Sequence, residues 1–428
     1  MKRFDDKFML GAATSAHQVE GNNVNSDYWI MENLPASNFK EPSKDAVDHY
    51  NRYREDIKLL SDAGLNAYRF SIEWARIEPE KGKFDKNEIE HYREVLKCCY
   101  EYSVKPIVTL HHFSSPKWLI SEGGWECEKT IEYFSRYCSY VVSELGELMP
   151  YICTINEANM GVQISRIMKE YIGKLEALKK KNADVQVGLN VEKPIDKFNR
   201  GLEEAFGIEA DKVQTFLSPR TPEGDAIIIQ CHVKAREVIK AINPNIKVGI
   251  TMSLYDYQAL PGGEKFIETM WHEDLLHYLP YLKEDDFLGV QNYTRKIFDA
   301  NGKVDPGKDA KMTQMDNEKY PLSLAGVIRF TSKHWDKEII VTENGIATSD
   351  DVERIEFIKE VLAGLYQCVN EGIPVTGYMY WSLFDNFEWQ KGYDKQFGLV
   401  AVDRKTQTRY PKESLTVLGN IKKFGLSL

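Results

Sequence analysis

The chain has 428 residues, of which 43% are hydrophobic and 12% aromatic, and it carries a formal net charge of −10. The apolar content is enough for a large core. Because α/β barrels with insertions reach this length as one unit, we expect residues 1–428 to form a single domain. The acidic excess argues against nucleic acid or an anionic membrane surface as a partner, since both call for basic patches.

Neither the N-terminus nor the cysteines indicate export or a bilayer span. No apolar run approaches the roughly 20 residues that cross a membrane. The apolar stretch 8–16 follows two basic residues, as in a signal peptide, but Asp5 and Asp6 interrupt that pattern, and a first strand is the better interpretation. The seven cysteines are odd in number and form no CxxC pair. We interpret them all as reduced, small core residues, which favours a cytoplasmic location.

Short β-rich runs alternate with longer helical segments along the chain. Apolar residues recur every three or four positions in segments such as 46–64 and 129–147, and the segment 351–372 ends at Gly372 with a proline just beyond. Strands that alternate with helices predict a parallel sheet, and eight such units favour a closed (β/α)8 barrel of the TIM type. The predicted strands are 8–15, 65–72, 105–110, 151–156, 246–253, 286–292, 338–343 and 374–383.

The segment 160–230 departs from this alternation. It is rich in charge and has no clear strand, so we expect an insertion between the fourth and fifth strands. A lysine run at 179–181 is typical of a solvated helix face rather than of a functional basic site. No internal repeat or low-complexity linker marks a second domain.

Polar and aromatic residues follow most of the predicted strands, at the end where barrels carry their reactive groups. Glu157 and Glu343 come from the fourth and seventh strands, on opposite sides of a closed barrel, and could flank one bond. Glycoside hydrolysis needs two such carboxyl groups. The other residues in these positions are amides, acids, indoles and bases that could bind sugar hydroxyls and ring faces: Gln18, Glu20, Arg69, Glu73, His111, His112, Asn156, Asn292, Tyr293, Asn344, Trp381, Asp385, Asn386, Glu388 and Trp389.

Each of these signals alone has a simpler explanation. An Asn-Glu pair at a strand end is more often a polar terminus or a helix cap. The pair His111–His112 has no HExxH-type partner, so we expect no metal, and nothing in the sequence calls for a cofactor. Trp381 and Trp389 alone would more often be core residues. The joint occurrence at the ends of successive strands favours a sugar site.

The same residues lie in motifs that resemble glycoside hydrolase family 1, the β-glucosidase and β-galactosidase family. The resemblance runs from the first strand to the end of the barrel, and its most specific parts are VTENG (341–345) and the W-S-L-x-D-N-F-E-W string that begins at Trp381. The other matching segments are FMLGAATSAHQVEG (8–21), YRFSIEWARIEP (68–79), TLHHFSSPKWL (109–119), TINEAN (154–159) and DFLGVQNYTR (286–295).

The resemblance implies a retaining exo-β-glycosidase that acts on a small carbohydrate or glycoside. Glu343 would be the nucleophile and Glu157 the general acid/base, with a raised pKa. Arg69 and Tyr293 would orient Glu343 and keep it ionised, and Asn156 would bind the sugar 2-hydroxyl. The residues implied to hold the rest of the sugar are Gln18, His112, Trp381, Glu388, Trp389 and Phe397.

Three departures from the family pattern bear on the substrate. Ala158 stands where the family usually has proline, and Phe113 stands where tryptophan is common. The usual Gly-Tyr and Ala-Pro-Gly pattern after the acid/base is missing from 160–190. That segment normally helps to wall the leaving-group site, so the leaving group cannot be transferred from the family.

Three alternative functions stay open. A 6-phospho-β-glycosidase would use Lys395 for the phosphate, but a carboxylate at Glu388 would repel a phosphate, and Phe397 replaces the usual tyrosine. A catalytically silent glycan-binding protein on the same barrel would typically have lost one of the two glutamates, and both are present. An enzyme that cuts within a polysaccharide would need an open cleft. Gluco or galacto preference, transglycosylation and oligomeric state are not predicted.

Overall fold

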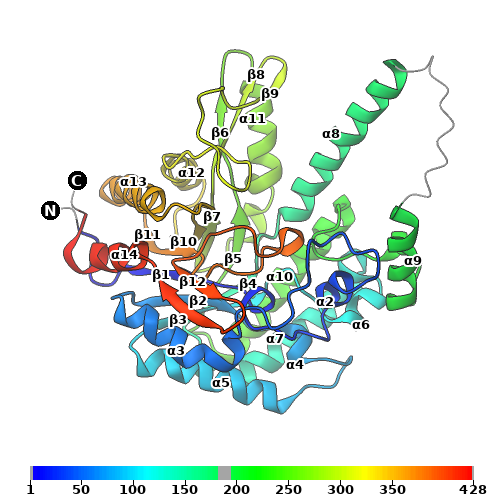
Figure 1. The fold of residues 1–428 in the computed structure, drawn as a ribbon, viewed down its shortest axis with the longest axis horizontal. Helices are drawn as coiled ribbons and strands as arrows, with labels where there is room; N and C mark the ends of the chain where they lie inside the picture. The colour runs from blue at the N-terminus through cyan, green and yellow to red at the C-terminus, as the bar shows by residue number, and fades with distance from the viewer. Residues whose placement is uncertain (1–2, 182–193, 427–428) are drawn as a thin grey trace.

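The computed structural model describes residues 3–181 and 194–426. Within that part of the chain, eight parallel strands close into a barrel surrounded by helices (Figure 1). The predicted barrel is therefore confirmed, and every predicted strand is present within two residues of its expected ends. The barrel strands are β1 (Met9–Ala13), β2 (Ala67–Ser71), β3 (Lys105–His111), β4 (Tyr151–Ile155), β5 (Lys247–Ser253), β7 (Phe287–Gln291), β10 (Glu338–Asn344) and β11 (Val375–Trp381).

The first strand closes the ring between the last and the second strands. In the β1–β11 pairing Met9 lies beside Gly377, and in the β1–β2 pairing Gly11 lies beside Ala67. A Cβ on Gly11 would lie 1.9 Å from the Ala67 carbonyl oxygen. Only glycine therefore allows the two strands to approach this closely. The strand residues are buried almost throughout, as expected for a parallel sheet covered on both faces.

Local capping chemistry explains where some of the helices begin and end. The Asp350 side chain accepts hydrogen bonds from the first backbone N–H groups of α13. Gly64 and Gly372 follow the ends of α3 and α13 with φ of 94° and 87°, the left-handed conformation that glycine adopts easily. The helices around the barrel are α3 (His49–Asp62), α5 (Lys86–Glu101), α7 (Lys129–Leu145), α10 (Pro222–Ile242), α11 (Glu264–Trp271), α12 (Ser323–Ser332), α13 (Asp351–Asn370) and α14 (Glu413–Phe424).

Shorter helices and two small sheets lie outside the barrel, and the sequence analysis did not predict the sheets. Their strands are short and mostly half-exposed, so they lack a clear hydrophobic period. The short helices are α1 (Ala16–Val19), α2 (Asp27–Glu32), α4 (Trp74–Ile77) and α6 (Lys117–Ser121), with a π-helical turn at His272–Leu276. The sheets are β6 (Asp256–Ala259), β8 (Arg295–Asp299) and β9 (Gly302–Val304), and β12 (Val400–Asp403) with β13 (Thr408–Pro411).

The insertion predicted between the fourth and fifth strands is present. It contains α8 (Met160–Lys181) and α9 (Pro194–Phe206), and α10 follows it. Helix α10 packs against α7 and β5 and so takes the crossover position between the two strands. Helix α8 projects away from the barrel (Figure 1). The lysine run at 179–181 falls in α8, but its side chains lie outside those that the structure describes.

The cysteines are all free, and six of the seven are buried as predicted. The prediction is wrong for Cys127, which is only half-buried. Cys127 ends the short turn Gly124–Glu126 in an extended conformation, outside the helices that supply most of the core.

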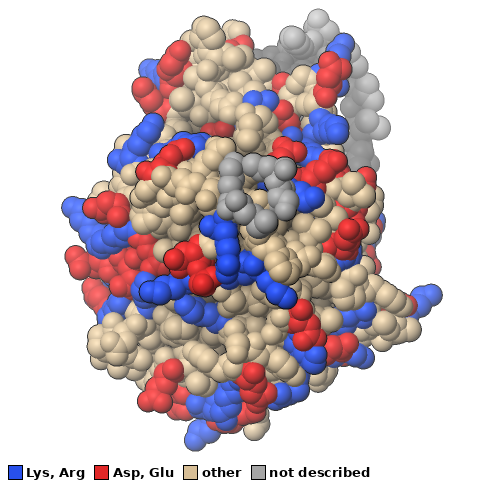
Figure 2. All heavy atoms as spheres, turned by 90° about the vertical axis from the view of Figure 1, so that its left-hand side faces the viewer, with Lys and Arg blue, Asp and Glu red and all other residues tan. Residues whose placement is uncertain are grey.

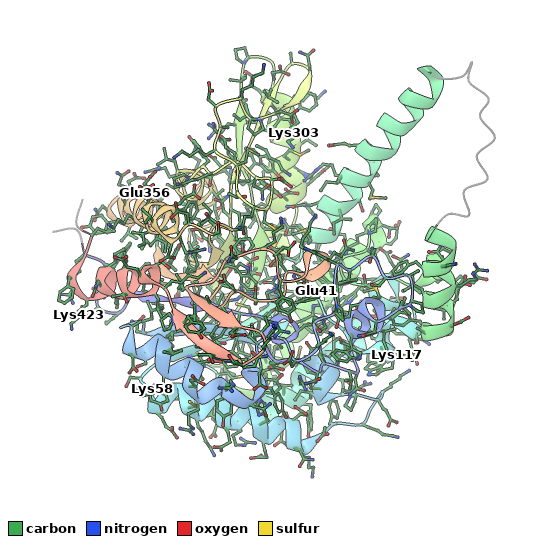
Figure 3. The ribbon with its side chains drawn as sticks, in the orientation of Figure 1. Glu41, Lys58, Lys117, Lys303, Glu356 and Lys423 are labelled. Carbon is green, nitrogen blue, oxygen red and sulfur yellow. The ribbon has the colours of Figure 1, made fainter. Side chains whose placement is uncertain are left out.

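The outer surface carries both signs of charge. On the face shown in Figure 2, lysine and arginine are interspersed with aspartate and glutamate. The charged side chains labelled in Figure 3, such as Lys58 on α3 and Glu356 on α13, are exposed. In residues 3–181 and 194–426 no helix combines the length and the apolar character that crossing a membrane requires.

Candidate active site

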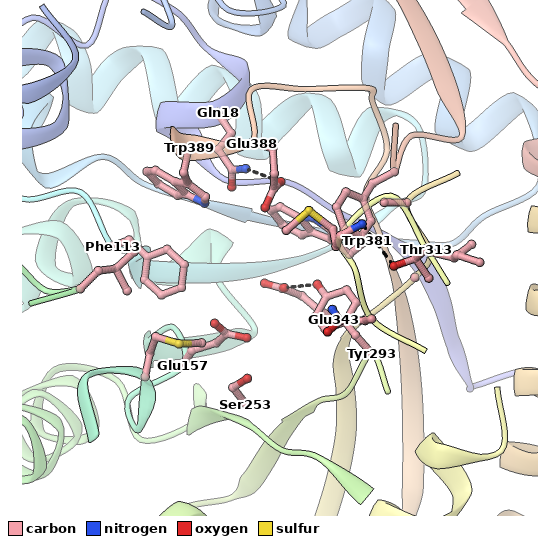
Figure 4. Close-up of a pocket in the computed structure, with 18 of the residues that line it drawn as sticks. Gln18, Phe113, Glu157, Ser253, Tyr293, Thr313, Glu343, Trp381, Glu388 and Trp389 are labelled. Carbon is pink, nitrogen blue, oxygen red and sulfur yellow. Dashed lines mark hydrogen bonds between the residues drawn. The ribbon is translucent and has the colours of Figure 1, made fainter. Parts of the chain in front are cut away.

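A cavity of about 250 Å³ opens at the C-terminal ends of the barrel strands (Figure 4). Glu157 and Glu343 both line it, so the two acids, distant in sequence, share one hollow. Six of the residues expected to hold the sugar also line it, namely Gln18, His112, Trp381, Glu388, Trp389 and Phe397. Tyr293 lines it as well, whereas Arg69 and Asn156 lie fully buried behind the wall.

Glu343 is held by one cation and one hydroxyl. The Arg69 Nη1 lies 2.6 Å from one carboxyl oxygen of Glu343, and the Tyr293 hydroxyl donates to the other at 2.7 Å. Both contacts favour the charged form of the carboxyl group. With both oxygens occupied, the carboxylate is fixed in one orientation on β10.

Arg69 also determines how Asn156 and His112 are oriented. The guanidinium group can only donate, so the Asn156 atom 2.5 Å from its Nη2 must be the carbonyl oxygen Oδ1. The Asn156 amide therefore donates to His112 Nε2 at 3.2 Å. Burial and the nearby Arg69 hold the pKa of His112 well below its usual range, so the ring is neutral and its proton lies on Nδ1. Among the described residues this Nδ1 has no partner, which leaves a buried donor in the cavity wall.

Glu157 stands in a tight turn directly after β4. Its backbone is left-handed, with φ of 44°, and its N–H donates to the Thr251 hydroxyl at 3.0 Å. Ala158 follows, and its N–H donates to the Thr251 carbonyl oxygen at 3.0 Å. Proline at this position could not make that bond. Arg220 donates to the Ala158 carbonyl, so the turn is fixed by hydrogen bonds rather than by a proline ring.

The two acids differ in what surrounds their charge. Burial, and then repulsion from Glu343, raises the pKa of Glu157 to about 8. Burial also raises the pKa of Glu343, but Arg69 and Tyr293 oppose that rise. Of the pair, Glu157 is therefore the one that holds a proton near neutral pH, and Glu343 is the one equipped to carry negative charge.

The third acid of the cavity is Glu388. Burial, and then repulsion from Glu343, raises its pKa to about 8. The Gln18 side-chain amide donates a hydrogen bond of 2.7 Å to the Phe387 carbonyl oxygen and lies 3.4 Å from a carboxyl oxygen of Glu388. Trp389 stacks on buried His17 with ring centroids 5.6 Å apart, which fixes the indole in the cavity wall.

Aromatic rings form the rest of the wall around the acids. Trp381 stacks on His112 with centroids 5.6 Å apart, and Phe397 meets Tyr293 edge-on at 6.0 Å. Phe113, which replaces the family's usual tryptophan, packs 5.4 Å from Trp389. An apolar wall is therefore retained at this position without an N–H donor.

Several strand-end residues singled out from the sequence lie outside the cavity. Glu20 accepts hydrogen bonds from Arg76 and Tyr92, and Glu73 caps α4 and binds Ser114. His111 faces away from His112 and lies 3.0 Å from Ser115. Because Glu20, Glu73 and His111 are buried among other protein groups and do not line the cavity, the prediction that they contact a sugar is wrong. Asn292, Asn344, Asp385 and Asn386 likewise do not line the cavity.

Sequence reasoning missed the outer part of the cavity. Met160 and Ile164, on the first turns of α8, line it together with residues from loops and from the end of β5. The spacing of four between the two α8 residues was the available signal, but no motif covered it. The other missed lining residues are Leu217, Ser253, Leu254, Tyr255, Thr313, Met315, Asn317, Gly345, Ile346 and Ala347.

Fold and site together define a glycoside hydrolase, and comparison with known proteins agrees. The profile of glycosyl hydrolase family 1 matches residues 1–191 and 274–424. The chain belongs to this family. It is 27% identical to β-glucosidase A of Acetivibrio thermocellus, with 96% of each chain covered. It is 28% identical to a 6-phospho-β-galactosidase of Staphylococcus haemolyticus, with 97% of each covered. A solved β-glycosidase, BGL167, is 41% identical, with a TM-score of 0.87 and with 99% of this chain and 98% of that chain covered.

Proposed function

We propose that the chain is a retaining exo-β-glycosidase that removes one terminal β-linked glucose- or galactose-type unit. The observation that carries this is one cavity lined by both Glu157 and Glu343, with different groups around each acid. The names of relatives such as β-glucosidase A support the glucose-type substrate. The whole chain acts as one catalytic unit on a small carbohydrate.

The reaction follows from the charge assignment. Glu343, held by Arg69 and Tyr293, attacks the anomeric carbon and forms a glycosyl–enzyme ester. Glu157 gives its proton to the departing oxygen in the same step. Glu157 then accepts a proton from water, which attacks the ester and releases the sugar with its original configuration. The unpaired proton on His112 Nδ1 serves a sugar hydroxyl. Asn156, buried behind the wall, acts through His112, to whose Nε2 its amide donates.

The inner end of the cavity suits a terminal unit. Gln18, Glu388 and Trp389 converge there, and the side chains behind them are buried. Groups that meet the far edge of one sugar leave no passage for a polymer to continue. This supports an exo action rather than cutting within a polysaccharide.

A 6-phosphorylated substrate is the second candidate, because some relatives are named 6-phospho-β-galactosidases. The raised pKa of Glu388 weakens the expected repulsion, since a neutral acid repels a phosphate less than a carboxylate does. The position of Lys395 argues against a phosphorylated substrate, because its ammonium group is not available in the cavity. Its ammonium group donates to the Gln314 carbonyl and does not line the cavity. A single lysine engaged elsewhere is a weak phosphate site.

The test is a panel of 4-nitrophenyl β-glycosides, with and without a 6-phosphate, assayed on the wild type and on Glu343→Ala. We expect hydrolysis of unphosphorylated β-glucoside or β-galactoside and a loss of at least about 10⁴-fold in kcat for the variant, as for other essential nucleophiles. Hydrolysis of the phosphorylated substrates alone would overturn the sugar assignment. Unchanged activity of Glu343→Ala would overturn the mechanism.

The free thiols support a cytoplasmic location. All seven cysteines are unpaired, and a reducing compartment keeps thiols in this state. Fractionation of the native host followed by immunodetection tests this proposal.

A further inference from the structure

The cavity has two ends of different chemistry. The inner end carries the acids and the amide described above. The outer end, on the leaving-group side of Glu157, is lined mainly by aliphatic and thioether side chains, and its members with polar groups are Ser253, Tyr255, Thr313 and Asn317. Its apolar lining residues are Met160, Ile164, Leu217, Leu254, Met315, Ile346 and Ala347.

The apolar lining continues out of the cavity along α8. Ile167 and Met168 follow Ile164 by three and four residues, so they lie on the same face of the helix one turn further out. Both are exposed, with 54% and 42% of their surface accessible. From Met160 to Met168 the face runs roughly 12 Å at the 1.5 Å rise of an α-helix. We call Met160, Ile164, Ile167 and Met168 the α8 stripe.

The α8 stripe is fixed relative to the catalytic acids. Gln163, at the edge of the α8 stripe, and Arg166, further round the helix, bond to buried Asp274, with Gln163 Nε2 3.0 Å and Arg166 Nη2 3.0 Å from its carboxyl oxygens. Asn159, just before the helix, donates to the Ser253 and Asp274 carbonyls. The stripe is therefore held at the mouth of the cavity by buried polar contacts.

From this geometry we propose that the leaving group of the natural substrate is a long apolar one, an alkyl chain or an extended hydrocarbon, and that the α8 stripe binds it. This rests on the proposed function, because it names the leaving group of that same site. A second sugar would require several hydrogen-bonding groups to match its hydroxyls. Ser253, Tyr255, Thr313 and Asn317 offer such groups within the cavity, but the α8 stripe, which continues outward from it, offers none. An apolar chain that leaves the anomeric oxygen beside Glu157 meets Met160 and Ile164 first and Ile167 and Met168 next. Because the α8 stripe begins inside the catalytic cavity, a leaving group attached to the bound sugar is the occupant that we propose for it.

The experiment measures kcat/KM for n-alkyl β-D-glucosides from methyl to octyl, below their micellar concentrations, by the glucose released. Full burial of a methylene corresponds to about a four-fold gain in affinity. Contact with one wall should contribute about half of that free energy, so we expect kcat/KM to rise about two-fold per added carbon. The paired variant Ile167→Glu/Met168→Glu should reduce the octyl-to-methyl ratio at least ten-fold. Both residues are exposed, so folding is not at stake.

Val352→Glu is the matched control, since Val352 is an exposed apolar residue on α13 that does not line the cavity. It should keep the wild-type octyl-to-methyl ratio. A ratio near one in the wild type would overturn the proposal, and higher kcat/KM for cellobiose than for octyl β-glucoside would do the same. A change in sedimentation coefficient on the stripe substitutions, with the ratio unchanged, would show instead that the stripe joins two copies of the chain. If 4-nitrophenyl β-glucoside is not hydrolysed at all, the proposed function itself fails.

Discussion

The protonation states in the cavity depend on three glutamates around one sugar-sized space, of which Glu157 and Glu343 are buried and Glu388 is half-buried. Glu343 raises the pKa of both Glu157 and Glu388 through its charge, in addition to the effect of burial. Only Glu343 has a guanidinium group in contact, at 2.6 Å. The pH dependence of the enzyme is therefore a property of the group of acids rather than of one residue.

On the alkaline side, kcat/KM should decrease with a midpoint near pH 8. Glu157 must be protonated to act as an acid, and its pKa is raised to about 8, so activity is present below that pH and is lost as pH rises through it. Replacing Glu343 with glutamine removes a repelling charge and should lower the pKa of Glu157. NMR titration of the 13C-labelled glutamate side chains measures the pKa of Glu157 in the wild type and in Glu343→Gln. The Glu157 signal is identified by its absence in Glu157→Gln. An unmoved pKa would show that the acids are not coupled.

Tyr293→Phe should shift the acidic limb upward. The Tyr293 hydroxyl donates 2.7 Å to Glu343 and favours its charged form, so its loss raises the pKa of the nucleophile. Since the bond also orients the carboxylate, we expect kcat/KM to fall roughly 10- to 100-fold, below the 10²–10³ measured for a lost oxyanion donor. Rate profiles from pH 4 to 9 provide the measurement. A loss of rate with an unshifted acidic limb would restrict Tyr293 to a packing role.

At the scale of elements, helix α8 connects the acid/base turn to the rest of the insertion. Its first turns are tied to the barrel through Asp274, which also accepts a hydrogen bond from Tyr257. No family motif marks this connection, because the segment after the acid/base departs from the usual pattern. The element that shapes the leaving-group side is therefore the part of the molecule least determined by the family resemblance.

Asp274→Ala should loosen α8 without touching the catalytic acids. It leaves Arg166 with only the Glu273 carboxylate, and Gln163 and Tyr257 lose a partner. We expect a loss of about 2–3 kcal/mol in the free energy of unfolding, less than for a fully buried pair because Glu273 remains. Thermal unfolding and hydrogen exchange of peptides covering 160–166 give the measurement. Unchanged exchange in those peptides would show that Asp274 does not hold the helix.

At the scale of the whole molecule, the fold depends on closing the barrel between β1 and its two neighbours. Gly11→Ala should oppose closure, since the added methyl group would lie 1.9 Å from the Ala67 carbonyl oxygen. Backbone at the centre of a barrel cannot move away easily, so we expect destabilisation of about 3 kcal/mol or more. Gly307→Ala is a control, because its Cβ would meet nothing within 4 Å. Equal urea midpoints for the two variants would contradict this account of closure.

The barrel and the inner end of the cavity could be predicted from the sequence because both depend on local patterns. Each buried strand is a short apolar run, and Glu157, Glu343 and Trp381 lie at the ends of such runs, where a closed barrel gathers them. The strands β6, β8 and β9 were not predicted because they are short and half-exposed. The outer wall of the cavity was missed because Leu217, Tyr255 and Met315 come from loops whose convergence depends on tertiary packing.

The central claim is that Glu343 forms a covalent bond with the sugar while Glu157 supplies the proton. The most direct test is incubation with a 2-deoxy-2-fluoro β-glucoside that carries a good leaving group, followed by peptide mass spectrometry. The fluorine slows both steps, and the activated leaving group restores the first, so the ester accumulates. The account predicts one adduct, on the peptide containing Glu343, and its absence in Glu343→Gln. An adduct on Glu157 or Glu388, or inversion of configuration with no adduct, would contradict it.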